Sequence, residues 1–221
     1  AYSDLSNLFW KQEKYEQGLE YGLKSISFFE EREVVDLDYD FTLYVVGNNY
    51  LSLSQYDKAR GYYSRSIEIG ERYGFYNNLS DVYISLVDLY AFLNEFENAE
   101  EAGKNAIKYA YLLDNAFMLM RSYLSVGELH LQNENYLEAI ENIQKSIEVA
   151  TPNFGDGFFL SKAYNSLGKA YAENKQYQEA YKAFAVYDSL NDIVFTAEAD
   201  QRIAQLQTEF SLAQKENTIQ L

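Results

Sequence analysis

The chain has 221 residues, of which 48% are hydrophobic and 17% aromatic, so it can bury a substantial core, which argues against disorder over most of its length. Its formal net charge of −16 disfavours binding to nucleic acid and to anionic lipid, because both need a basic surface on the protein. The absence of cysteine excludes disulfides, thiolate nucleophiles and cysteine-based metal sites. A single proline and 11 glycines favour long helices over a fold with many turns.

Five related segments recur along the chain. The first reads KYEQGLEYGLKSI from Lys14, and the fourth reads NYLEAIENIQKSI from Asn135. Each begins with a polar residue followed by an aromatic one, and the aromatic residues follow a period of 40 or 41 residues, at Tyr15, Tyr56, Phe96, Tyr136 and Tyr177. A spacing this regular over four intervals indicates a repeat protein.

A second helical pattern lies upstream of these segments. It reads LYVVGNNYLSL from Leu43 and YNSLGKAYAEN from Tyr164, with related stretches between them. Apolar and small residues recur three and four positions apart, which is typical of a helix with one buried face. Short polar stretches, such as residues 52–55 and 133–135, separate the two patterns. Each unit is therefore predicted to be a helix–turn–helix hairpin, and the chain an all-α superhelix of about five hairpins.

These hairpins resemble tetratricopeptide repeats, whose pattern is W-x2-L-G-x2-Y…A-x3-F. The second unit matches it at Leu43, Val46, Gly47, Tyr50, Ala59 and Tyr63, and the fifth at Tyr164, Leu167, Gly168, Tyr171, Ala180 and Phe184. The small residues are expected where the two helices approach closely, namely Gly47, Gly127, Gly168, Ala59, Ala99, Ala139 and Ala180. The resemblance covers residues 1–190 and implies a solenoid that binds a protein or peptide.

The units depart from the usual 34-residue repeat by about six residues, close to one extra turn for each helix. Longer units resemble those of bacterial peptide-sensing regulators. The stretch from Thr151 to Gly157 contains the only proline and two glycines, so the joint between the fourth and fifth units is expected to be the loosest.

The last residues, 191–221, are predicted to form a separate long helix, because they contain no proline or glycine. Ile203, Leu206, Phe210 and Ala213 step by 3, 4 and 3, which would suit a coiled coil and a homodimer; the alternative is a helix that caps the solenoid. The segment also resembles the junction between an N-terminal tetratricopeptide domain and a membrane span in bacterial sensor proteins.

That second resemblance implies the sensor region of a bacterial histidine kinase of a two-component system or of a helix-turn-helix regulator. It places the chain in the periplasm, as the extracytoplasmic segment of a membrane-anchored protein, with membrane contact only through segments outside this sequence. The alternative is a cytoplasmic, constitutive assembly scaffold without a signalling output.

No catalytic, cofactor or metal site is expected. His130 is the single histidine and occupies the slot filled by Tyr50, Tyr90 and Tyr171 in other units, which favours a structural role. The acidic run over residues 30–40 lacks the spacing of a calcium loop and is expected to be a solvated face. The sequence therefore predicts a binding module that is not an enzyme.

The predicted ligand site is the inner groove, which the first helix of each hairpin lines in this architecture. Ten positions on these helices are candidates, and they change from neutral and apolar, through acidic, to basic along the chain: Phe41, Tyr44, Asn48, Asp81, Asp88, Arg121, Glu128, Lys162, Asn165 and Lys169. Such a gradient would orient a peptide by its charge. The alternative is that these are ordinary solvated positions.

Overall fold

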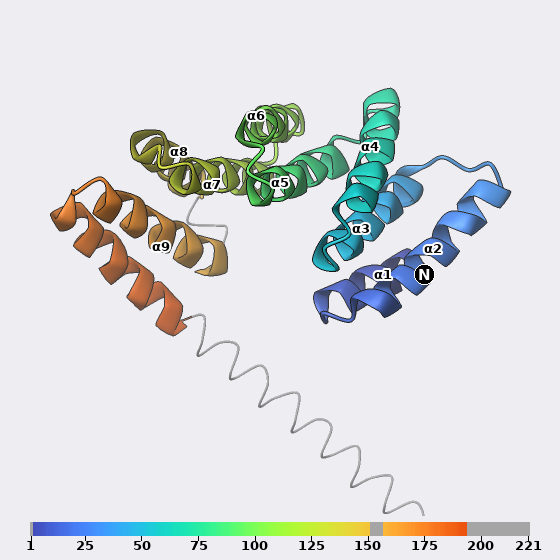
Figure 1. The fold of residues 1–221 in the computed structure, drawn as a ribbon, viewed down its shortest axis with the longest axis horizontal. Helices are drawn as coiled ribbons and strands as arrows, with labels where there is room; N and C mark the ends of the chain where they lie inside the picture. Colours follow the sequence, from blue (N-terminus) through green and yellow to red (C-terminus); the bar gives the residue numbers. More distant parts are fainter. Residues whose placement is uncertain (1, 151–156, 194–221) are drawn as a thin grey trace, which may run out of the picture. The chain divides into compact units, whose positions relative to one another are not determined.

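The computed structural model describes residues 2–150 and 157–193, and all of the regular elements in those ranges are helices (Figure 1). The first helices of the hairpins are α1 (Tyr2–Lys11), α3 (Leu37–Ser52), α5 (Tyr76–Phe92), α7 (Ala116–Gln132) and α9 (Gly157–Glu173). The second helices are α2 (Tyr15–Glu31), α4 (Tyr56–Tyr73), α6 (Phe96–Leu112) and α8 (Tyr136–Val149), and residues 177–193 are also helical. The predicted all-α fold of helical hairpins is confirmed.

The turn inside each hairpin has the same geometry throughout. A residue that is not glycine takes a left-handed conformation, with φ between 57° and 62°, at Glu13, Ser54, Asn94, Glu134 and Lys175. The next backbone N–H then donates to the carbonyl five residues back, as Asn135 N does to His130 O at 2.9 Å. This bond satisfies a helix-end carbonyl. The repeat position that His130 occupies therefore closes the turn through its backbone carbonyl.

The two helices of a hairpin approach closely at the predicted small residues. A side chain at Gly47 would place its Cβ 2.5 Å from the Tyr63 ring, and one at Gly168 would lie 2.7 Å from the Phe184 ring. Ala59, Ala99 and Ala139 are fully buried. Because real Cβ atoms do not approach neighbours this closely, glycine is required at these positions, as the repeat pattern predicted.

The chain divides into two compact units, Ala1–Thr151 and Pro152–Leu221. The division falls in the breaker-rich stretch that the sequence indicated, although the linker residues 151–156 lie outside the described residues. The predicted boundary between a solenoid at 1–190 and a helix at 191–221 stays a prediction, since residues 194–221 are not described. The coiled-coil positions Ile203 to Ala213 also lie outside the described residues.

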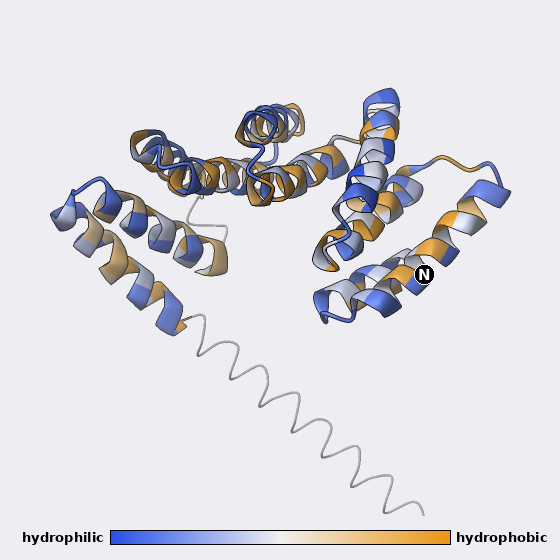
Figure 2. Cartoon of the chain, viewed as in Figure 1, coloured by the Kyte–Doolittle hydropathy of each residue, from blue (hydrophilic) through white to orange (hydrophobic). Residues whose placement is uncertain are grey.

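Within the first unit, the helices form two rows. Helices α1, α3, α5 and α7 each contact their equivalents in the neighbouring hairpins, whereas α2, α4, α6 and α8 contact only first helices (Figure 1). In a curved stack the more closely spaced row lies on the inside. We call the first set the inner row and the second set the outer row. The turns within the hairpins are mostly hydrophilic, whereas the connection between α2 and α3 includes hydrophobic residues (Figure 2).

Candidate peptide-binding groove

The inner row of the first unit presents the predicted groove positions on α3, α5 and α7, but it exposes them unequally. On α3, Tyr44 and Asn48 are buried, and Phe41 is half-buried with its ring centroid 6.2 Å from that of Tyr44. On α5 and α7, Asp88 is exposed and Glu128 is half-buried. The surface that a ligand can reach therefore lies mainly on α5 and α7.

Asn48 lies at the centre of a hydrogen-bonded cluster that joins α3, α4 and α5. Its side-chain oxygen accepts from the Tyr63 hydroxyl at 2.6 Å and from Ser85 Oγ at 3.1 Å. Asn48 is only 2% exposed and Tyr63 is fully buried. Burial raises the pKa of the Tyr63 and Tyr44 hydroxyls above their ordinary value, so both stay neutral. The structure gives Asn48 a packing role, and its contact with a ligand stays a prediction.

Asp81 and Arg121, two of the predicted site residues, form an ion pair between α5 and α7. Arg121 Nη1 donates to Asp81 Oδ1 at 2.5 Å, and each side chain is 23% exposed. Burial raises the pKa of Asp81, and the attraction of the Arg121 guanidinium opposes that rise. The guanidinium also lies 5.8 Å from the centre of the Phe117 ring. The pair neutralises this part of the predicted charge gradient.

Asp88 and Glu128 line an open cavity of about 310 Å³ between α5 and α7. Apolar side chains from both helices and the amide of Gln132 complete its wall. The full lining consists of Val87, Asp88, Ala91, Phe92, Ser125, Glu128, Leu129 and Gln132. The structure thus brings two predicted acidic residues to one concave site, while Lys162, Asn165 and Lys169 lie on α9 in the second unit.

Sequence reasoning missed the burial of Asp40, which lies in the acidic run that was expected to be solvated. Its carboxyl is fully buried and accepts from Ser66 Oγ at 2.5 Å and from Asn78 Nδ2 at 3.0 Å. Burial raises the pKa of Asp40, and the two hydrogen bonds act in the opposite direction. The signal was present in the sequence, because Asp40 lies three residues before Leu43 on the buried face of α3. The expectation of a solvated face was wrong for this residue.

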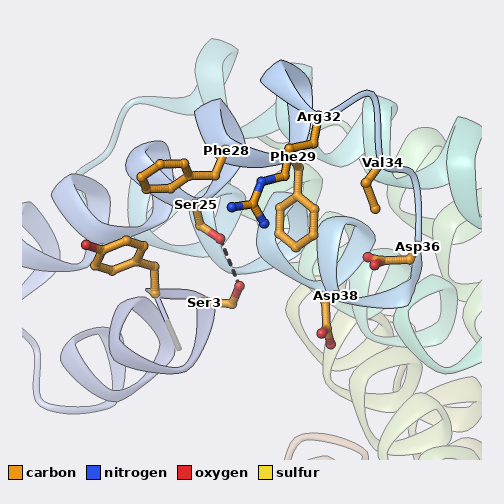
Figure 3. A pocket seen from close by; sticks show the side chains of 9 residues that line it. Ser3, Ser25, Phe28, Phe29, Arg32, Val34, Asp36 and Asp38 are labelled. Atoms are coloured by element: carbon orange, nitrogen blue, oxygen red, sulfur yellow. Dashed lines mark hydrogen bonds between the residues drawn. The ribbon is translucent and has the colours of Figure 1, made fainter.

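A second cavity, of about 480 Å³, lies among α1, α2 and the start of α3. Figure 3 shows the Arg32 side chain reaching in beside Phe28 and Phe29, with Asp36 and Asp38 on the α3 side. Asp36 Oδ1 caps α3 by accepting from the backbone N–H of Tyr39 at 2.9 Å. This cavity holds a cation, two carboxylates and aromatic rings, none of which the sequence had assigned to a site.

The described residues contain no group of three or more His, Cys, Asp or Glu side chains that could hold a metal ion. None of the helices in residues 2–150 and 157–193 is long and apolar enough to cross a bilayer. The side chain of His130 is half-buried, and its Nδ1 is buried without a hydrogen-bond partner in the structure. In the first unit, the geometry thus defines a stack of helical hairpins whose inner row carries an open, partly acidic cavity.

Comparison with known proteins agrees with this fold. The model of the family described as Tetratricopeptide repeat matches residues 118–185. These residues are therefore similar to tetratricopeptide repeats, which generally serve protein–protein interaction through their concave surfaces. No curated protein matches the sequence.

Several solved structures are similar to this chain. BtubC (BKLC) from P. vanneervenii has a TM-score of 0.76 and 17% identity, covering 87% of this chain and 79% of that one. A putative kinesin light chain from Podosopora anserina with nearly identical TPR-like repeats has a TM-score of 0.65 and 11% identity, covering 87% and 94%. MamA from Desulfovibrio magneticus RS-1 has a TM-score of 0.60 and 16% identity, covering 86% and 93%. At these identities the likeness shows the fold.

Proposed function

We propose that this chain is a protein- or peptide-binding tetratricopeptide module and that its partner binds on the inner row of the first unit. The observation that carries the proposal is the open cavity between α5 and α7, where exposed Phe92 lies beside Asp88 and Glu128. An exposed aromatic ring bordered by charged side chains is typical of a protein-binding surface. Packing of the hydrophobic core alone would not require an exposed aromatic ring beside two acidic side chains.

Photo-crosslinking tests which row binds the partner. Benzoylphenylalanine replaces Phe92 on the inner row in one variant and Leu137, 67% exposed on the outer-row helix α8, in a matched control. Both variants are exposed to extract from the source cell. The proposal expects a specific crosslinked protein from position 92 and none from position 137. Crosslinks from position 137 alone would place the partner on the outer row and contradict the proposal.

We further propose that the chain is the sensor region of a bacterial signal-transduction protein. The resemblance of its last residues to membrane-proximal junctions supports this role and an extracytoplasmic location, with cytoplasmic placement as the alternative. A sensor needs two states that bind the partner with different affinity, whereas a constitutive scaffold, the second candidate, needs only one.

The absence of native cysteine allows spin labels to be placed cleanly at two exposed positions. Asp57→Cys on α4 and Tyr181→Cys in the second unit carry the labels, and pulsed electron resonance measures the distance between them. The sensor role predicts that this distance distribution shifts when the partner identified by crosslinking binds. The scaffold role predicts no shift. An alkaline phosphatase fusion, which is active only outside the cytoplasm, tests the location in the complete gene product.

A homodimer through the predicted C-terminal helix, residues 191–221, is part of the same proposal. Light scattering of the 221-residue chain and of a version ending at residue 193 measures the mass of each. A dimer that becomes a monomer on truncation supports pairing through this segment, and an unchanged mass argues against it.

A further inference from the structure

Two neighbouring helix contacts of the inner row, α3 with α5 and α5 with α7, carry different residues at equivalent positions of the repeat. At the joint between α3 and α5, the Asn48 oxygen accepts hydrogen bonds from Tyr63 and Ser85, as described above, while the Asn48 Nδ2 is buried without a partner. One period of 40 residues later, the equivalent positions hold Asp88, Gly103 and Ser125. The joint between α5 and α7 therefore has a carboxylate in place of an amide and lacks the tyrosine.

Ser125 also lacks the hydrogen bond that its counterpart Ser85 donates to the Asn48 oxygen. Val87 takes the position of Gly47, and a side chain at Gly103 would lie 2.6 Å from Val126 and 3.8 Å from Val87, so apolar groups occupy this region instead of the ring. Neither valine supplies a hydroxyl. Ser125 is 7% exposed, and its buried Oγ has no hydrogen-bond partner in the structure.

Ser125 also lines the cavity between α5 and α7, so the unpartnered hydroxyl lies in the wall of an accessible site. A buried polar group without a partner costs free energy unless a water or a ligand satisfies it. The same wall carries the carboxylates of Asp88 and Glu128 and the ring of Phe92, which is 64% exposed. The cavity thus combines a hydroxyl acceptor, negative charge, an aromatic face and an apolar floor.

This combination identifies one chemical class of ligand. A long apolar stem can pack on Val87, Ala91 and Leu129, while a positive end group donates to the hydroxyl and the carboxylates. A planar guanidinium can also stack on an aromatic ring and bridge two acceptors, which an ammonium does less well. We propose that the cavity between α5 and α7 is a pocket for an arginine side chain of the partner.

This inference rests on the proposed function, because it names the side chain by which a peptide would be held on the inner row. A site for a peptide's C-terminal carboxylate needs positively charged side chains, whereas this pocket carries two negatively charged ones. The net charge of −16 agrees with a basic partner, because opposite charges steer the two molecules together.

The test uses the whole 221-residue chain and three defined probes: the capped peptide acetyl-Ala-Arg-Ala-amide, the same peptide with citrulline, and the same peptide with glutamate. Citrulline keeps the shape of arginine but has no charge. Amide NMR shifts report where each probe binds. We expect the arginine peptide to shift the amides of Val87, Ser125 and their neighbours, with the citrulline peptide binding roughly tenfold or more weakly.

Two double variants remove the same charge at different places. Asp88→Asn with Glu128→Gln neutralises the pocket, and Asp57→Asn with Glu138→Gln neutralises two exposed residues on the outer row. The pocket variant should weaken arginine-peptide binding roughly tenfold or more, and the outer-row variant should not weaken it measurably at physiological salt. An equal loss in both variants would mean general attraction to a negative protein and would overturn the pocket.

Ser125→Ala separates a binding role from a structural one. Removing an unpartnered buried hydroxyl should raise the melting temperature, yet it should weaken the arginine peptide several-fold. If the variant melts higher and binds equally well, the hydroxyl takes no part and the pocket is wrong.

The outcomes also separate this inference from the proposed function. If the citrulline or glutamate peptide binds the inner row as well as the arginine peptide does, the arginine pocket is overturned and the peptide-binding function stands. If none of the three peptides shifts an inner-row amide and position 92 yields no crosslink, both are overturned.

Discussion

The inner-row helix α3 and the outer-row helix α4 use similar lengths of chain very differently. Eleven of the 16 residues of α3 are buried, including polar residues on several faces, whereas only four of the 18 residues of α4 are buried. Helix α3 contacts α1, α2, α4 and α5, and α4 contacts only α3 and α5. With eleven of its residues buried, α3 has little surface left for a ligand. In this fold, closeness to the groove does not by itself make a side chain accessible.

The largest expected difference between the rows concerns glycine. Gly47→Ala on α3 places a methyl group 2.5 Å from the Tyr63 ring and should lower the free energy of unfolding by about 3 kcal/mol. Gly61→Ala on α4 meets nothing within 4 Å and should raise it by about 0.5–1 kcal/mol, because alanine is the better helix former. Urea unfolding of both variants measures the contrast. A loss below about 0.5 kcal/mol for the α3 variant would show that the inner row tolerates expansion.

Ion pairs provide the next comparison. Arg121→Gln leaves the mostly buried Asp81 carboxylate without its cation and should cost about 2 kcal/mol. Arg72→Gln breaks the pair with Glu68 on α4, where the two side chains are 63% and 69% exposed, and should cost less than about 0.5 kcal/mol. Thermal unfolding at matched pH and salt checks both. Equal costs would contradict the view that the inner row excludes water from its charges.

Buried and exposed acids on the same helix should differ in their pH dependence. Because burial raises the folded-state pKa of Asp40, its carboxyl stabilises the fold most below the unfolded pKa of about 4, and that contribution is lost as the pH rises through the folded pKa. Asp40→Asn should therefore become more stable than the native chain, by about 1 kcal/mol at pH 7, because the buried charge is removed. The Ser66 hydroxyl and the Asn78 amide can each reverse to pair with the new amide.

Asp38→Asn, two residues away and exposed, changes the net charge equally and serves as the control. Urea midpoints measured from pH 4 to pH 7 should diverge from those of the native chain for the Asp40 variant and run parallel for the Asp38 variant. Parallel curves for both would show that the Asp40 carboxylate has access to water.

The smallest expected effect lies in the turns, which the two rows share. Ser54→Gly relieves a side chain held at φ 57° and should stabilise the fold by about 0.5 kcal/mol, since glycine takes this conformation without strain. Gly74→Ala, at φ 75° after α4, should destabilise it by about 1 kcal/mol. Melting temperatures should move in opposite directions, and a shift in the same direction would contradict the strain at these turns.

Local patterns in the sequence predicted much of the fold. The aromatic residues at the 40-residue period each begin the second helix of a hairpin, as Tyr56 begins α4 and Phe96 begins α6. The polar tetrad before Tyr56 forms the turn, and Gly47 and Ala59 pack between helices as predicted. These features depend on contacts within one hairpin. Their partners lie close together in the sequence, so the spacing of residue types is enough to predict them.

Exposure along the groove was harder to predict, because it depends on residues from other hairpins. Asn48 is a predicted groove residue, but Ser85, from the following hairpin, donates to its oxygen, and the side chain is only 2% exposed. Asp81 resembled a free acid in the groove, but Arg121 lies 40 residues away and pairs with it. The sequence by itself determined the repeat, its hairpins and its close contacts. Only the tertiary structure decided which polar side chains are buried in packing and that the Ser125 hydroxyl lies without a partner in the wall of an open cavity, because burial is set by the assembly of several hairpins.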